Sequence, residues 1–112
     1  MEDVISESKQ LNAHIRESED YKCYLLTKQV LYEHSDLCNQ LMEFRRRNYE
    51  LQNQQDINPY DEVNALVIEY DTLLHNSIVS DFLQAEQKVC ILMQKVFISL
   101  TEGLEFDYLN ER

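Results

Sequence analysis

The stretch NSIVSDFLQAEQKVCILMQKVFISLTEG, residues 76–103, decides the fold of this chain. Its apolar side chains recur at steps of three and four, the spacing of one face of an α-helix. The apolar seam formed in this way consists of Val79, Phe82, Glu86, Val89, Met93, Val96 and Leu100. A second line spaced by seven runs beside it and consists of Leu83, Cys90, Phe97 and Leu104. The pattern predicts a helix of about 27 residues, or about 40 Å, capped at its start by Asn76-Ser77.

A helix of this length carries more apolar surface than one small bundle can cover. We therefore expect it to meet a second copy of the chain, most simply in a two-fold homodimer of coiled-coil character. Glu86 stands in the apolar seam between Phe82 and Val89, where an apolar residue is expected. A carboxylate at such a position needs a cationic or hydrogen-bonding partner, because an unpaired buried charge is costly. We expect that partner to be Arg45 or a tyrosine, in a structural rather than a catalytic role.

The rest of the chain predicts four further amphipathic helices. Their start signals are Ser18 before two acids, Ser35-Asp36, and Asn58 before Pro59. The expected helices span residues 3–16, 18–33, 35–55 and 58–75. One Gly and one Pro in 112 residues leave little material for the turns of a β-rich fold. We predict an all-α fold, a bundle of about five helices dominated by long antiparallel helices, in a single domain 1–112 whose residues 105–112 fray.

The charge of the chain excludes some partners. Its 21 acidic and 10 basic residues give a net charge of −11, which repels the phosphates of nucleic acids and of anionic lipids. The longest apolar run, Val89–Met93, is far shorter than the ~20 residues that span a bilayer. The opening MEDVISESKQ lacks the pattern of a signal peptide. We expect a cytoplasmic protein with three reduced cysteines that binds neither nucleic acid nor membrane.

Arg45, Arg46 and Arg47 form the only basic cluster in this acidic chain. One interpretation is a solvated helix face, with Glu43–Arg47 and Arg46–Glu50 pairs four residues apart. The other is that one arginine turns inward or offers its forked donor group to a partner. We favour the solvated face.

Candidates for catalysis are weak. His34-Ser35-Asp36 contains the letters of a catalytic triad, but the side chains of neighbouring residues point apart. His34 and Cys38 are four apart, yet a helix start falls between them, and a structural zinc site needs four ligands. Cys90, on the apolar face, is expected in the core. The sequence therefore predicts no catalytic, metal-binding or cofactor-binding residue, no cofactor and no enzymatic activity.

Several of these segments together resemble the YlbF/YmcA family of small bacterial helical proteins, over about residues 3–107. The residues that carry the resemblance are Ile15-Arg16-Glu17-Ser18 with Tyr21, Leu41 and Phe44 with the polar run to Gln52, Asn76, and Val79-Ser80-Asp81-Phe82-Leu83-Gln84-Ala85-Glu86. The resemblance implies long antiparallel helices that self-associate, and a non-enzymatic regulatory role. Members of this family are accessory factors of competence, sporulation and biofilm control, and the resemblance implies such a role here. They act partly by modulating an RNA-processing endonuclease within a small complex. Some members carry a cysteine-rich tail linked to iron–sulfur binding, which is not present up to Arg112, so that cofactor is not expected here.

The resulting hypothesis is a cytoplasmic regulatory adaptor that acts through protein–protein contacts. The interaction and structural residues expected to serve it are Glu86, Arg45, Arg46, Arg47, Phe82, Val89, Met93, Val96 and Leu100. One alternative is an acidic helical holdase that shields apolar segments of client proteins, as prefoldin-like hairpins do. Another is a branch of the family that has no assigned function. A metal- or thiol-dependent enzyme is the third class, and the residues give it no support.

Overall fold

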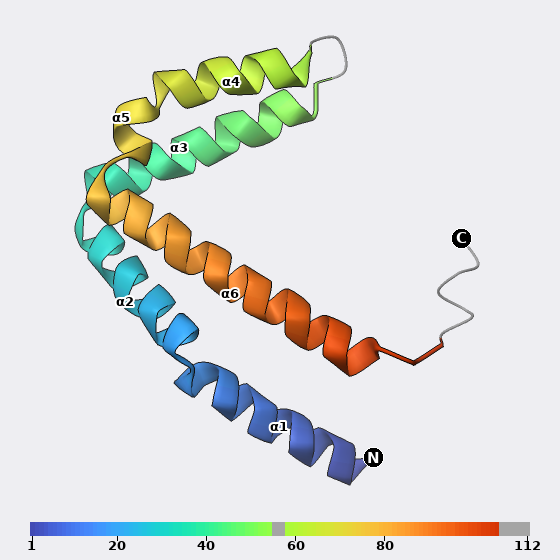
Figure 1. Cartoon of the computed structure of the whole chain (residues 1–112). Coiled ribbons are helices and arrows are strands. Elements are labelled where there is room, and N and C mark those ends of the chain that lie inside the picture. Colours follow the sequence, from blue (N-terminus) through green and yellow to red (C-terminus); the bar gives the residue numbers. More distant parts are fainter. Residues whose placement is uncertain (55–57, 106–112) are drawn as a thin grey trace.

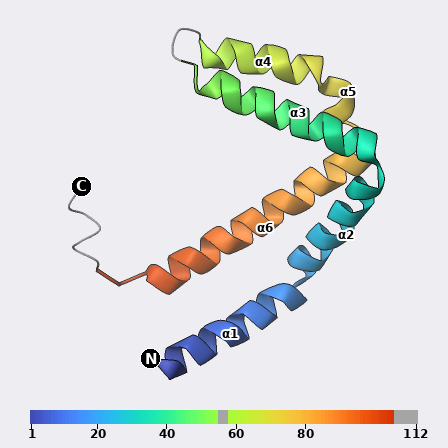
Figure 2. The same ribbon diagram turned by 180° about the vertical axis from the view of Figure 1, so that it is seen from behind.

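A computed structural model describes residues 1–54 and 58–105 (Figures 1 and 2). These residues form helices and contain no strand, which confirms the all-α prediction. The helices are α1 (Glu2–Glu17), α2 (Glu19–Glu33), α3 (Ser35–Gln52), α4 (Pro59–Glu69), α5 (Asp71–Leu74) and α6 (Ser77–Thr101). The expectation that residues 105–112 fray concerns positions that, apart from Glu105, lie outside the described residues. None of the described helices is long and apolar enough to cross a membrane.

Three of the predicted helix starts have the expected cap geometry. The Ser18 hydroxyl accepts the N–H of Tyr21 at 3.2 Å, and the Asn58 side chain accepts that of Tyr60 at 3.1 Å. The Asn76 side-chain oxygen accepts two N–H groups, those of Ile78 and Val79, at 2.9 and 3.3 Å. Such caps satisfy N–H groups that have no partner within the helix.

Helix α3 begins differently from the prediction. Its N-cap is His34, which makes no side-chain cap hydrogen bond, and Ser35 is already the first helical residue. At the other end of the described chain, α6 is followed by Glu102 and then by Gly103, which has φ 83°. The backbone leaves the helix at Glu102, whose ψ is 128°, and the positive φ of Gly103 completes a tight turn in which the Leu104 N–H bonds back to the Thr101 carbonyl at 3.0 Å.

The predicted fourth helix is wrong in one respect, because it is divided into α4 and α5. Tyr70, between them, has ψ 18°, far from the helical value of about −42°. The change of direction lets Leu66 stay buried against α3 while Leu73 enters the main core. A single straight helix could not satisfy both contacts, so tertiary packing overrides the continuous helical pattern.

The helices form two arms that meet at an elbow (Figures 1 and 2). One arm, the hairpin arm, consists of α3 and α4 side by side. In the other, α6 runs along α2, and α1 extends beyond the end of α2 away from the elbow. The main core lies at the elbow and consists of Leu31, Leu41, Leu73, Val79 and Phe82. Each of α2, α3, α5 and α6 contributes to it, so the core fixes where the arms join.

Beyond the elbow the protein is one helix layer thick. In both face-on views the helices of the two arms lie beside one another, and none lies over another except near the elbow. The radius of gyration is 18.6 Å, whereas a compact chain of this length has about 13 Å. Most domains bury their apolar faces between two packed layers. Here the broad faces of the arms are left without a second layer.

Candidate functional site

The arginine cluster, Arg45–Arg47 on α3, is engaged by carboxylates throughout. Arg45 Nη2 donates to Glu86 Oε1 on α6, and its guanidinium lies 5.7 Å from the centre of the Phe82 ring. Glu86 thus has one of the partners that the sequence suggested for it. The two side chains are 41% and 30% exposed, so solvent weakens the pair. The contact joins the hairpin arm to α6 just beyond the core.

Arg46 is the one member of the cluster that pairs only within its own helix. Its Nε donates to Glu43 at 3.1 Å, and its Nη1 donates to Glu50 at 2.7 Å. The hydrogen bonds from Arg46 are the main cause of a lowered pKa of Glu43. The predicted Glu43–Arg47 pair is wrong, because Glu43 is taken by Arg46 and Arg47 turns toward α4. The favoured solvated-face interpretation therefore holds for Arg46 alone.

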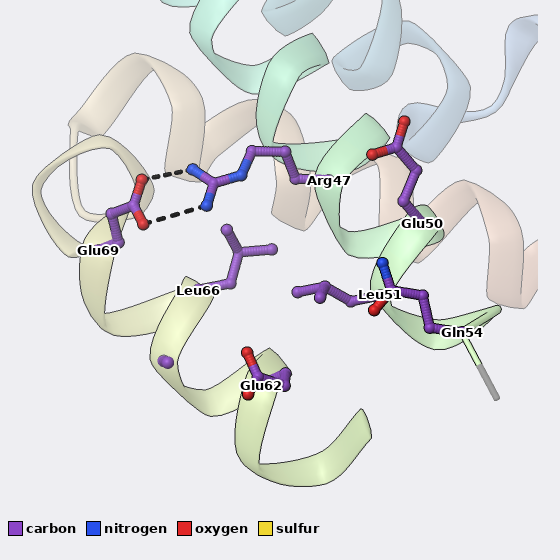
Figure 3. A pocket seen from close by; sticks show the side chains of 8 residues that line it. Arg47, Glu50, Leu51, Gln54, Glu62, Leu66 and Glu69 are labelled. Atoms are coloured by element: carbon purple, nitrogen blue, oxygen red, sulfur yellow. Dashed lines mark hydrogen bonds and ion pairs between the residues drawn. The ribbon is translucent and has the colours of Figure 1, made fainter. Parts of the chain in front are cut away.

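Arg47 makes a forked contact, as in the interpretation that we did not favour, but its partner belongs to the same chain. Both of its Nη atoms donate to Glu69 on α4, Nη2 at 3.2 Å, and Nη1 also lies 3.4 Å from the Tyr70 hydroxyl. The guanidinium stands 5.6 Å from the centre of the Tyr70 ring. Hydrogen bonding to Arg47 lowers the pKa of Glu69. These contacts hold the two helices of the hairpin arm together (Figure 3).

A hollow of about 220 Å³ lies beside this contact, between α3 and α4 (Figure 3). Its lining residues are Arg47, Glu50, Leu51, Gln54, Glu62, Ala65, Leu66 and Glu69. Three carboxylates against one arginine give the hollow a negative charge, and that arginine is already held by Glu69. The hollow is therefore a poor site for a phosphate or another anion.

The seam of α6 divides into a covered and an uncovered part. Val79 and Phe82 are 0% and 5% exposed in the elbow core, and Val89 and Val96 are half-buried. Farther along, Met93 is 43% exposed. The apolar residues of this distal part that are still more exposed are Phe97 at 67%, Ile98 at 62% and Leu100 at 58%.

A shallow groove of about 550 Å³ follows this uncovered part of α6. It is lined by Val89, Cys90, Met93, Gln94, Phe97 and Ile98. The prediction that Cys90 lies in the core is wrong, because its side of α6 is exposed. Seven-residue spacing shows that Cys90 and Phe97 share a face with Leu83, but only the elbow end of that face meets other helices.

The residues first considered for chemistry stay apart in the structure. His34 caps the end of α2 with its Nδ1 2.9 Å from the Val30 carbonyl oxygen, and Ser35 and Asp36 are exposed. Within residues 1–54 and 58–105, no group of three or more His, Cys, Asp or Glu side chains is placed to hold a metal ion.

Sequence reasoning missed two clusters of side chains. Glu69 and Tyr70 are 22 and 23 residues from Arg47, so no local spacing points to their contact. Lys28 stands 5.8 and 5.4 Å from the ring centres of Tyr24 and Tyr32. The spacing of four between these three residues is a signal that could have identified the second cluster.

These features define a class of protein: a small all-α molecule whose prominent surface is an exposed apolar helix face rather than an enclosed cleft. Residues 4–105 match a family model described as control of competence regulator ComK, YlbF/YmcA. The chain belongs to the YlbF/YmcA family, as its resemblance indicated, and the description of that family is regulatory. No curated protein and no solved structure matches the chain.

Proposed function

We propose that this protein is a non-enzymatic, cytoplasmic regulatory adaptor that acts as a homodimer by binding other proteins. The observation that carries the proposal is the exposed apolar face of α6 from Val89 onward, with its groove of about 550 Å³. Contiguous apolar surface on this scale is a sign of protein–protein contact. Exposed Phe and Met are side chains that protein interfaces favour.

Nucleic acid is a poor partner for this surface. Binding to phosphates depends on available Lys and Arg side chains, and each arginine of the cluster already pairs with a carboxylate. The net charge of −11 adds long-range repulsion. We therefore assign the regulatory action to contact with a protein.

The pathway proposed is the one that the family resemblance implies, namely accessory control of RNA processing or of competence, sporulation and biofilm development. The family description, control of competence regulator ComK, supports a regulatory role of this kind. An adaptor in a small complex could influence RNA while touching only the proteins that process it. No side chain of this chain needs to take part in chemistry.

Affinity purification of the tagged protein from its native cytoplasm tests the proposal. We expect one or a few partners at stoichiometric ratio, lost when Phe97→Asp and Ile98→Asp place charges on the exposed face of α6. Ile68→Asp is a matched control, since Ile68 is 74% exposed on the hairpin arm. Many weak partners, together with suppressed aggregation of unrelated proteins, would favour the holdase alternative instead.

A further inference from the structure

The distal arm, which we define as α1 with residues 87–101 of α6, has apolar side chains on both helices that the described chain leaves exposed, among them Val4 on α1 and Phe97 and Ile98 on α6. We propose that a second copy of the chain covers them, so that α1 of each copy lies on the distal half of α6 of the other. This inference rests on the proposed homodimer and specifies which surfaces form it.

The first observation is that α1 is an amphipathic helix without a buried residue. Its apolar stripe contains Val4, Ile5, Leu11 and Ile15. Val4 and Ile5 are 67% and 48% exposed, whereas Leu11 and Ile15 are half-buried. Among the described helices α1 lies close to α2 alone. A helix of 16 residues is marginally stable in water by itself, and tertiary contacts normally stabilise it. The stripe therefore requires a surface to cover it.

The second observation is that α1 and α6 of one copy do not close on each other. The two helices run alongside each other (Figures 1 and 2), but their backbones make no close contact. A hollow of about 220 Å³ lies between Leu11 of α1 and residues Lys95, Val96, Ser99 and Leu100 of α6. The open side of each helix thus remains available to another chain.

The third observation is the distribution of charge, which selects a second copy as the occupant. Residues 87–101 of α6 contain Lys88 and Lys95 and no acid, whereas α1 carries Asp3 and Glu7 beside its stripe. Within the described part of the chain, no ion pair engages these four side chains. A two-fold interface joins a surface to itself, so a surface of one sign would repel its copy. Acids on one helix and lysines on the other make the distal arm complementary to itself.

The exposed area agrees with an interface of this kind. The chain exposes 9145 Å², whereas a compact monomer of 13.4 kDa exposes about 6,500 Å². The open, one-layer shape thus leaves more surface accessible than a compact chain of this mass would, and a standard interface takes ~800 Å² from each partner.

Charge reversal tests the contact. One variant carries Asp3→Lys and Glu7→Lys, and the other carries Lys88→Glu and Lys95→Glu. In each homodimer α1 and the facing α6 would then carry like charges. We expect self-association, measured by sedimentation equilibrium at low salt, to weaken about tenfold or more in each variant and to recover when the two variants are mixed. Recovery should fade as salt rises, because screening removes both the repulsion and the rescue.

The matched control is Asp61→Lys with Glu62→Lys, which makes the same change of charge in the first turn of α4, on the hairpin arm. The control should self-associate like the original chain, and far-UV circular dichroism should show all variants equally helical. If the original chain dimerises but Asp3→Lys with Glu7→Lys leaves it unchanged, the α1 contact is refuted and the adaptor proposal stands. A chain that is monomeric at 100 µM refutes both the contact and the homodimer, and would assign the distal arm to a different protein.

Discussion

Arg45 and Arg47 are two residues apart on α3, yet they reach different helices. Arg45 pairs with Glu86 on α6 and stacks over Phe82, while Arg47 pairs with Glu69 on α4 and stacks over Tyr70. Each therefore contacts a carboxylate and an aromatic ring that are close in sequence, Glu86 and Phe82 on α6 and Glu69 and Tyr70 at the end of α4. Arg46 reaches neither α4 nor α6 and pairs with Glu43 and Glu50 on its own helix, α3. At the scale of the residue, the cluster is a set of structural contacts between helices.

A double-mutant cycle should separate these roles. For Arg45→Ala and Glu86→Ala we expect a coupling free energy of about 0.5–1 kcal/mol, since the pair is partly exposed. The control cycle, Arg46→Ala with Glu50→Ala, should give about 0.3–0.5 kcal/mol, as for an ordinary i,i+4 helix pair. Urea unfolding measures both. Equal coupling in the two cycles would argue against a special role for Glu86.

Acid should loosen the hairpin arm through Glu69. Its pKa is lowered from 4.5 by Arg47, so the folded state favours the ionised carboxylate. The stabilisation is present above pH 4.5 and is lost as the pH falls toward the lowered pKa of the folded state. We expect the urea midpoint to drop less steeply from pH 5 to pH 3 in Glu69→Gln than in the original chain. Identical pH profiles would show that the pair contributes nothing to stability.

At the scale of the element, side-chain caps set where three helices begin. Asn76 matters most among them, because it satisfies two N–H groups and precedes Val79, which is fully buried. The start of α6 therefore coincides with the elbow core. A loose start there would disturb the position of the whole distal arm.

Asn76→Ala should cost about 1–2 kcal/mol, the upper part of the range for N-cap removal. Asn58→Ala is the matched comparison, and we expect it to cost about 0.5–1 kcal/mol because its side chain caps one N–H group, far from the core. Urea unfolding followed by circular dichroism gives both values. A larger cost for Asn58→Ala than for Asn76→Ala would contradict the greater importance of the Asn76 cap.

The whole molecule is a one-layer, two-armed protein with an acidic surface and an uncovered apolar face. The acidic charge disfavours binding to nucleic acid. The uncovered apolar face favours binding to another protein. The elbow core joins the two arms. The distal arm therefore presents its apolar face beyond the core, at a distance from the hairpin arm.

Generic RNA should not bind this protein with submicromolar affinity at 100 mM salt. The net charge of −11 opposes it, and the arginine cluster is occupied by carboxylates. Fluorescence anisotropy measures this directly. The informative variant is Arg46→Ala, which removes a surface cation and leaves the cross-helix pairs of Arg45 and Arg47 in place. Saturable binding that this variant abolishes would place the regulatory action on RNA itself.

The sequence by itself determined the all-α class, the cap residues of α2, α4 and α6, and the need of Glu86 for a partner. These features follow from local rules, because periodicity and capping involve residues only a few positions apart. Arg45 as that partner was a reasonable prediction, since few cations were available in so acidic a chain.

Only the tertiary structure decided the break at Tyr70, the Arg47–Glu69 contact and the exposure of Cys90. A helical pattern states which residues share a face, but it does not state which neighbouring helix covers that face or how far along. That depends on where the chain folds back, which the core around Leu73 and Val79 determines. The seam of α6 has one pattern along its length, and the elbow covers only its first half because the two arms diverge beyond it.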